Sequence, residues 1–162
     1  MSTTNERRER AQRLFAEAYQ AQMKGELGRA VELYSASIEM CPTPEAFTFR
    51  GWAYSFQGDY ERAIQECLRA IELDPDFGNP YNDIGAYLIE QGRLEDAIPW
   101  LERAARAKRY ESPCFPLFNL GRIYERKHQL AKAREQYEKA LLSNSRYAPA
   151  QRALKRVRAA WN

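Results

Sequence analysis

Apolar residues recur along this chain at the spacing of amphipathic helices that come in pairs. Within residues 47–71 they fall three or four positions apart in two runs, which places them on one face of each helix. A polar turn at Gly58 separates the runs, and a similar turn lies at Gly92, where glycine adopts the left-handed conformation that ends a helix. The second run stops before Pro75, which has no backbone N–H to donate. The pattern predicts two helices joined by a tight turn.

This helical pair is repeated. Gly51, Gly85 and Gly121 begin matching runs (Gly-Trp-Ala-Tyr, Gly-Ala-Tyr-Leu and Gly-Arg-Ile-Tyr) at steps of 34 and 36 residues. A second series places a small residue, a larger one and another small residue in each second helix: Ala30, Tyr34 and Ser37; Ala63, Cys67 and Ala70; Ala97, Leu101 and Ala104; Ala133, Tyr137 and Ala140. Small residues allow two helix axes to approach closely. Because one such pair cannot bury its apolar faces alone, we expect the units to stack.

The chain therefore resembles a tetratricopeptide repeat protein over roughly residues 10–145. The second unit carries the family pattern in Phe47, Gly51, Tyr54, Ala63, Cys67, Ala70 and Pro75. The resemblance implies an all-α fold, a right-handed α-solenoid of four helix pairs plus a C-terminal capping helix. The expected segments are a polar N-terminal extension at 1–10, repeats at 11–43, 44–77, 78–113 and 114–147, and a basic capping helix at 148–162.

Several positions depart from the family pattern. Arg109 stands in place of proline in a third unit that is about two residues longer, and His128 replaces the turn glycine of the fourth. Pro99 lies early in a second helix, where we expect a kink. The closing helix is expected over residues 148–161, with one apolar stripe formed by Ala150, Leu154, Val157 and Trp161.

Composition and charge narrow the class of protein. The 162 residues include 25 Lys and Arg and 22 Asp and Glu, and the excess positive charge lies after residue 145. A nucleic-acid footprint spread over the whole chain is therefore not supported. Three dispersed cysteines, the lack of a long apolar run and the polar first residues predict a cytoplasmic protein with no membrane span and no export signal.

Catalytic chemistry finds little support in the sequence. His128 is the only histidine, and the three cysteines lack the paired spacing of a zinc site. No glycine-rich phosphate loop is present, since the run from Gly25 to Gly28 lacks the following Lys and Ser or Thr. We expect no enzyme activity, no metal and no cofactor.

In this family the first helices form a concave groove that usually holds a segment of another protein, so the resemblance implies a non-catalytic adaptor or scaffold. At the groove positions, large aromatic residues stand mainly in the early repeats and arginines gather toward the C-terminus. The candidate groove residues are Phe15, Tyr19, Trp52, Phe56, Asn82, Phe115, Phe118, Asn119, Arg122, Arg126 and Arg156.

The hypothetical ligand is a partner segment with apolar side chains toward the first two repeats. An acidic residue or a C-terminal carboxylate would lie near Arg122, Arg126 and Arg156, because arginine pairs bidentately with carboxylates. Alternatively, the aromatic residues pack against a neighbouring helix or the N-terminal extension, and Asn82 and Asn119 are merely solvated. The Lys and Asn clamp with which some relatives hold chaperone tails has no counterpart here, so that ligand is disfavoured.

Two other functions stay open. The basic residues Arg152, Lys155, Arg156 and Arg158, together with Trp161, form a candidate contact for nucleic acid or an anionic membrane surface. A charged helix face is more often simply solvated, so nucleic-acid contact is disfavoured. The third hypothesis is an assembly subunit that forms homo-oligomers through uncovered repeat faces.

Overall fold

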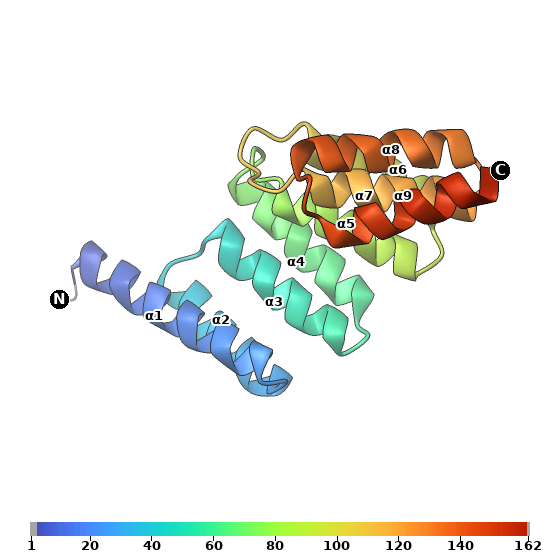
Figure 1. Ribbon diagram of the computed structural model, residues 1–162. Coiled ribbons are helices and arrows are strands. Elements are labelled where there is room, and N and C mark those ends of the chain that lie inside the picture. Colours follow the sequence, from blue (N-terminus) through green and yellow to red (C-terminus); the bar gives the residue numbers. More distant parts are fainter. Residues whose placement is uncertain (1–2, 162) are drawn as a thin grey trace. The chain divides into compact units, whose positions relative to one another are not determined.

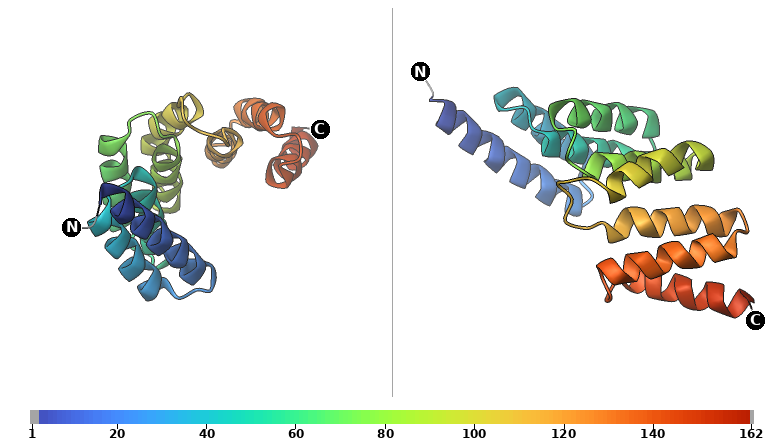
Figure 2. Two further views of the ribbon diagram at one scale, coloured as in Figure 1. Left: turned by 90° about the vertical axis from the view of Figure 1, so that its left-hand side faces the viewer. Right: turned by 90° about the horizontal axis from the view of Figure 1, so that it is seen from above.

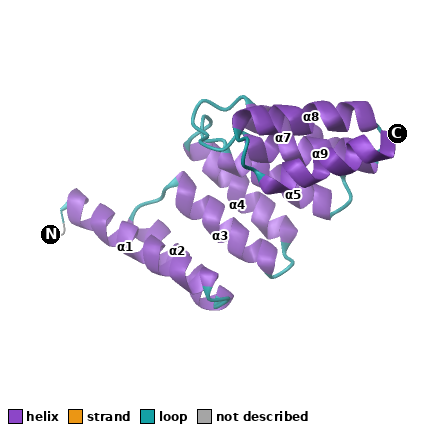
Figure 3. Cartoon of the chain, in the orientation of Figure 1, coloured by secondary structure: helices purple, strands orange, loops and turns teal. Residues whose placement is uncertain are grey.

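The computed structural model describes residues 3–161, and their regular secondary structure is helical (Figures 1 and 3). In chain order the helices are α1 (Thr4–Met23), α2 (Leu27–Met40), α3 (Pro44–Phe56), α4 (Tyr60–Leu73), α5 (Asn79–Glu90), α6 (Leu94–Ala105), α7 (Cys114–Arg126), α8 (Leu130–Ser143) and α9 (Ala148–Trp161). The predicted closing helix at 148–161 is confirmed as α9.

The chain divides into two compact units, one ending at Pro75 and the other beginning at Asp76. In the first unit α1 packs on α2, α2 on α3, and α3 on α4. In the second unit the same succession runs from α5 to α9, and α7, α8 and α9 lie side by side (Figure 2). The first unit ends where Pro75 was predicted to stop a helix, since α4 ends at Leu73.

Tight turns with positive φ join the two helices of each pair. Gly58 and Gly92 have φ values of 79° and 76°, which confirms the predicted left-handed glycines, and Gly25 has the same conformation. His128 occupies this place in the last pair with a φ of 57°. A side chain in this region carries steric strain that glycine avoids. The fourth turn therefore keeps the geometry of the others at a cost in stability.

Close approach of the paired helices explains the repeated glycines of α5 and α7. A Cβ at Gly85 would lie 2.4 Å from the Leu101 side chain, and one at Gly121 would lie 2.3 Å from the Tyr137 ring. In α3, a Cβ at Gly51 would lie 3.0 Å from a backbone oxygen of α4. These distances confirm the small-residue interpretation of the repeat.

Tyr34 and Tyr137, the fully buried tyrosines of the second helices α2 and α8, each donate a hydrogen bond to the first helix of their own pair. The Tyr34 hydroxyl donates to Gln22 Oε1 at 2.8 Å, and the Tyr137 hydroxyl donates to Glu125 Oε2 at 2.7 Å. Burial is the largest cause that raises the pKa of both phenols. The buried hydroxyls are therefore satisfied inside the helix pairs.

An ion pair is almost fully enclosed in the first unit. Arg50 of α3 donates from Nε and Nη2 to the Glu66 carboxylate of α4 at 2.7 and 3.0 Å, and from Nη1 to the Ser35 hydroxyl of α2 at 3.0 Å. The Arg50 and Glu66 side chains are 13% and 9% exposed. Three helices are thus joined by one charged cluster that the repeat pattern does not reveal.

The N-terminal segment and Pro99 both lie in continuous helices. Of residues 1–10, Thr3 is the N-cap of α1 and residues 4–10 lie within that helix, with a capping box between Thr3 and Glu6. Pro99 lies within α6, and that helix continues to Ala105.

The long third unit ends in a loop that pairs with the segment before α5. The Arg109 N–H donates to the Asp76 carbonyl, and the Gly78 N–H donates to the Arg109 carbonyl, each at 3.0 Å. The Arg109 guanidinium also lies 4.1 Å from the centroid of the buried Phe77 ring. Arg109, which replaces the family proline, thereby supplies an N–H that proline lacks.

The apolar stripe of α9 is confirmed except at its last member. Ala150, Leu154 and Val157 are buried, whereas Trp161 is 53% exposed. Trp161 lies in the last turn of the helix, where the Arg134 guanidinium sits 5.2 Å from its ring centroid. Trp161 thus ends the stripe with a cation–π contact at the surface instead of core packing.

Candidate functional site

The predicted aromatic residues of the first unit come together on α1 and α3. Phe15 and Tyr19 of α1 lie 5.3 and 5.9 Å from Phe49 of α3 between ring centroids, and Phe49 continues to Trp52 at 5.9 Å. Trp52 and Phe56 are 5.2 Å apart. Most of these contacts are edge-on, the arrangement that aromatic quadrupoles favour. Phe49, which the sequence analysis missed, links the residues of the two helices.

The aromatic side chains of α1 and α3 differ in how far they are exposed to solvent. Phe15 and Trp52 are half-buried, whereas Tyr19 and Phe56 are 38% and 59% exposed. The neighbouring Met23 of α1 is also exposed. Phe15 and Trp52 therefore pack at least partly inside the unit, whereas Tyr19, Met23 and Phe56 leave an apolar surface open, and a binding role for that surface stays a prediction.

In the second unit the two candidate asparagines meet each other. Asn119 Nδ2 donates to Asn82 Oδ1 at 3.0 Å, and both residues are buried. Arg122 Nη1 donates to Asn119 Oδ1 at 3.1 Å, and its Nη2 lies 3.4 Å from Glu90 Oε1. The asparagines thus join α5 to α7 and help to position Arg122.

Asp83 gives this polar chain a pH dependence. Burial raises the pKa of its carboxyl to about 7, although a hydrogen bond with Asn82 acts in the opposite direction. In the unfolded chain the carboxyl ionises near pH 4. Between about pH 4 and 7 the unfolded state therefore releases a proton that the folded state keeps, so the free energy of unfolding falls as the pH rises.

We expect Asp83→Asn to be more stable than the wild type at pH 8, by on the order of 2 kcal/mol, and to show a much smaller gain at pH 4. Urea unfolding of both proteins at the two pH values measures this difference. A stability gain that is the same at both pH values would contradict the assignment.

The three predicted arginines line one pocket of about 290 Å³, together with Glu125. Arg156 of α9 donates to both Glu125 oxygens, from Nε at 2.7 Å and from Nη2 at 2.8 Å. This contact is the largest cause that lowers the pKa of Glu125. Arg126 donates only to the Ile89 carbonyl, at 3.4 Å, and has no carboxylate partner within residues 3–161. Arg126 is therefore the cation of this pocket most available to an acidic ligand.

Phe115 and Phe118 lie near the start of α7 and pack on Tyr147, which precedes α9. The Phe115 and Phe118 centroids are 5.3 and 5.4 Å from that of Tyr147. Phe118 is half-buried, while Phe115 is 40% exposed. Burial raises the pKa of Tyr147, and the charges of Arg122 and Arg152 act in the opposite direction, so both cations lie within electrostatic reach of its phenol. The exposed Phe115 ring and the positive charges of Arg122 and Arg152 thus all lie close to Tyr147.

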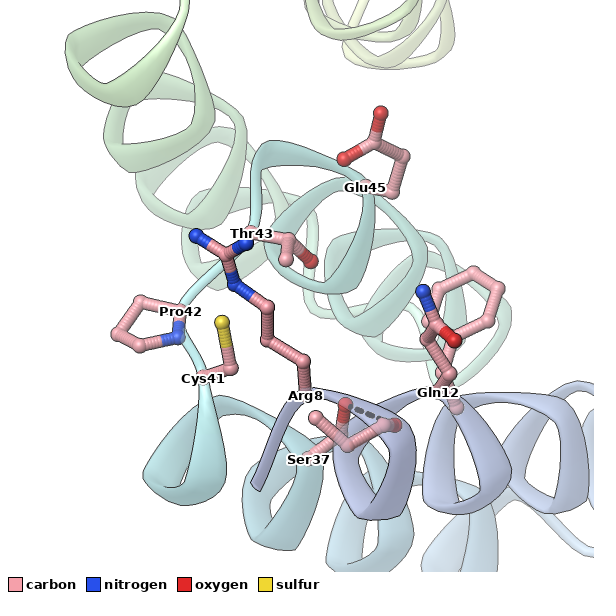
Figure 4. A pocket seen from close by; sticks show the side chains of 9 residues that line it. Arg8, Gln12, Ser37, Cys41, Pro42, Thr43 and Glu45 are labelled. Carbon is pink, nitrogen blue, oxygen red and sulfur yellow. Dashed lines mark hydrogen bonds between the residues drawn. The ribbon is translucent and has the colours of Figure 1, made fainter. Parts of the chain in front are cut away.

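A larger pocket, of about 580 Å³, lies in the first unit between α1 and the linker from α2 to α3 (Figure 4). Its apolar lining includes Ala11, Phe15 and Pro42, and the thiol of Cys41 also faces it. The polar lining residues are Arg8, Gln12, Ser37, Thr43 and Glu45. Of the predicted groove residues, only Phe15 contributes to this pocket.

The described residues offer little support for other kinds of site. Residues 3–161 contain no group of three His, Cys, Asp or Glu side chains placed to hold a metal ion. The three cysteines are free thiols. Among the described helices, none combines the length and apolar character needed to cross a bilayer.

Comparison with known families agrees with the repeat pattern. Tetratricopeptide repeat profiles match residues 44–77 and residues 76–142, which together are more than half of the chain. The fold is an all-α tetratricopeptide solenoid of the kind seen in solved members of the family. The chain therefore belongs to the tetratricopeptide repeat family.

Three proteins that resemble this chain share less than a third of its residues over the aligned region. The small glutamine-rich tetratricopeptide repeat-containing protein 2 of Mycosarcoma maydis is 29% identical over 144 residues, covering 88% of this chain but 38% of that protein. The chain thus spans well under half of the length of this relative.

Two solved structures illustrate the fold. PilF of Pseudomonas aeruginosa superimposes with a TM-score of 0.86 at 21% identity, covering 93% of this chain and 68% of PilF. YrrB, described as a tetratricopeptide repeat protein with an unusual peptide-binding site, has a TM-score of 0.65 at 20% identity, covering 90% and 75% of the two chains. At these identities the likeness defines the architecture alone.

Proposed function

We propose that this protein is a non-catalytic adaptor that binds segments of partner proteins on the first-helix faces of its repeats. The observation that carries the proposal is the exposure of large aromatic side chains on α1 and α3 in the first unit and on α7 in the second, together with the arginine pocket of α7 and α9. Aromatic and arginine side chains are the usual anchors of protein interfaces. Membership of the tetratricopeptide repeat family, in which YrrB is described as having a peptide-binding site, supports the same function.

The chemistry of the two units suggests what a partner segment contains. The open apolar surface of Tyr19, Met23 and Phe56 suits apolar side chains. In the second unit Arg126, with Arg122 beside it, suits an acidic side chain or a C-terminal carboxylate. Arg156 is already paired with Glu125, so in this proposal it shapes the pocket rather than serving as the first contact.

A nucleic-acid function is less well supported by the contacts of the C-terminal helix. Arg156 pairs with Glu125, Arg158 pairs with Glu138, and Trp161 lies against Arg134. These side chains are therefore partly occupied within the protein. The proposal also includes a cytoplasmic location and the absence of enzyme activity. The dispersed cysteines support the location, and the single histidine supports the absence of enzyme activity.

Affinity capture from the native lysate tests the proposal. We expect wild-type protein to retain a partner protein, and the double variant Trp52→Ala, Arg126→Glu to lose it. Lys155→Glu is the matched control, because it makes the same charge change at an exposed α9 residue outside the pocket. Mass spectrometry with and without nuclease identifies what is bound.

Retention that survives the double variant but disappears with nuclease or with Lys155→Glu would overturn the adaptor function in favour of nucleic-acid binding. Light scattering at two concentrations tests the third hypothesis. A mass that doubles with concentration would indicate self-association.

A further inference from the structure

The pocket of the first unit lies where the second unit places an aromatic ring. Ala18 and Tyr34 of the first helix pair correspond to Gly121 and Tyr137, which lie 103 positions later in the sequence. The same shift aligns three pocket residues with three residues around Tyr147. By this offset Ala11 corresponds to Cys114, Gln12 to Phe115 and Phe15 to Phe118. The two second helices also end alike, since the Cys41 N–H donates to the Ser37 carbonyl and the Asn144 N–H to the Ala140 carbonyl, each at 2.9 Å.

The linker before α9 has one residue more than the linker before α3, so the two linkers are compared at the residue directly before the next helix, which differs between the two places. Tyr147 precedes α9, and its ring packs on both Phe115 and Phe118. Thr43 precedes α3, and its hydroxyl accepts the Ala46 N–H at 3.2 Å as an N-cap. Because threonine lacks a ring, the corresponding space of the first unit stays open, with Thr43 in its wall (Figure 4). Phe15 also lines this space.

The walls of this pocket define the chemistry of an occupant. Its volume of about 580 Å³ lies within the range of roughly 300–1,000 Å³ typical of ligand pockets. The Phe15 ring corresponds to the Phe118 ring on which Tyr147 packs, so an aromatic side chain finds an edge-on partner there. Gln12 replaces Phe115 at the rim and offers an amide.

Charge adds a second requirement. Figure 4 shows Arg8 reaching from α1 toward the linker that carries Pro42 and Thr43, and within residues 3–161 Arg8 has no carboxylate partner. A guanidinium at the mouth of an otherwise largely apolar pocket is complementary to an acidic group. Glu45 lies at the same pocket and disfavours a second acidic group.

We propose that this pocket binds an aromatic side chain of a partner protein whose neighbouring acidic group pairs with Arg8. The inference rests on the proposed adaptor function and adds a site in the first unit, separate from the arginine pocket of the second. The occupant takes the place that Tyr147 holds in the second unit. The chain thereby leaves one aromatic position of its repeat pattern for another protein to fill.

N-acetyl-tyrosine is a suitable probe, because it carries a phenol ring beside a free carboxylate. Titration of the full chain, followed by ¹H–¹⁵N NMR, is expected to shift the amides of Gln12, Cys41 and Thr43 in a saturable way. N-acetyl-leucine and N-acetyl-tyrosine amide, which lack the ring and the carboxylate respectively, are expected to bind several-fold more weakly. Arg8→Ala is expected to lower the affinity for N-acetyl-tyrosine to that for its amide.

Filling the pocket gives the sharper test. Thr43→Tyr restores the missing ring and is expected to abolish the shifts, whereas Thr43→Val loses the same cap hydrogen bond without adding a ring and is expected to keep them. In affinity capture, Thr43→Tyr is expected to reduce the retained partner relative to Thr43→Val. Arg126→Glu is expected to leave binding of N-acetyl-tyrosine unchanged, which separates this site from the arginine pocket.

The inference is overturned if N-acetyl-tyrosine produces no saturable shifts, if Thr43→Tyr leaves them intact, or if shifts occur without any effect of Thr43→Tyr on captured protein. Should Thr43→Tyr fail to fold, Arg8→Ala still decides the charge requirement, because Arg8 is an exposed residue. A dimer that becomes a monomer in Thr43→Tyr would assign the pocket to a second copy of this chain instead of a partner protein.

Discussion

Glu66→Ala is expected to lower the free energy of unfolding by about 3–5 kcal/mol, because it leaves the Arg50 guanidinium enclosed without its counter-charge. Arg50 holds Glu66 through two hydrogen bonds and contacts Ser35 through a third, so the lost carboxylate affects α2, α3 and α4 together. Urea unfolding monitored by circular dichroism measures the change.

Two further variants test whether the loss of stability comes from the burial of this ion pair and not from the loss of any ion pair. Glu26→Ala removes an exposed partner of Arg29 and is expected to cost no more than about 0.5 kcal/mol. The double replacement Arg50→Met, Glu66→Leu is expected to recover much of the stability lost in Glu66→Ala, since apolar pairs of similar volume often replace buried ion pairs without loss. A Glu66→Ala protein as stable as Glu26→Ala would contradict the enclosed ion pair.

Gly121→Ala is expected to destabilise the second unit by about 2 kcal/mol, because the new methyl group would overlap the Tyr137 ring. Tyr137 is fully buried and its hydroxyl is held by Glu125, so the ring has little room to move. In the first helix pair, alanine (Ala18) and tyrosine (Tyr34) occupy the corresponding positions together. We therefore expect α7 and α8 of the variant to relax by moving apart.

Gly28→Ala provides the matched control for this substitution. Gly28 lies in α2, and a Cβ there meets no atom within 4 Å. This variant is expected to gain about 0.5–1 kcal/mol from the higher helix propensity of alanine. Equal melting temperatures for the two alanine variants would show that the helix contact at Gly121 is not tight.

The sequence predicted the helices well because their limits depend on local chemistry. The glycines with positive φ, the stop before Pro75 and the bounds of α9 all follow from residues within a few positions of the helix ends. The contacts of Gly85 and Gly121 could also be predicted, since the repeat places a large residue opposite each glycine.

The ion pairs and loop contacts of the charged residues could not be predicted from the sequence. Arg50 and Glu66 stand among polar residues of amphipathic helices, where most charges face solvent, and only the packing of three helices encloses them. Similarly, the spacing on α9 does not reveal that Arg156, rather than Arg152, meets Glu125. The pairing of Arg109 with the segment before α5 depends on a contact between two loops.

The candidate site was predicted in part. Sequence reasoning placed Phe15, Tyr19, Trp52 and Phe56 together, but side-chain exposure divides them, and the partners of Phe118 and Asn82 depend on tertiary packing. The pocket beside Phe15 did leave a sequence signal: Thr43 stands directly before a helix, where the corresponding linker carries Tyr147.

Site-specific photo-crosslinking in the native cell tests the adaptor function most directly. A photoreactive amino acid replaces either Phe115, an exposed residue of α7, or Leu142, an α8 residue that is 88% exposed. We predict that a partner protein is crosslinked from position 115 and not from position 142, and that Arg126→Glu removes the product. Equal crosslinking from both positions, or products that contain nucleic acid alone, would contradict the binding of partner segments on the first-helix face.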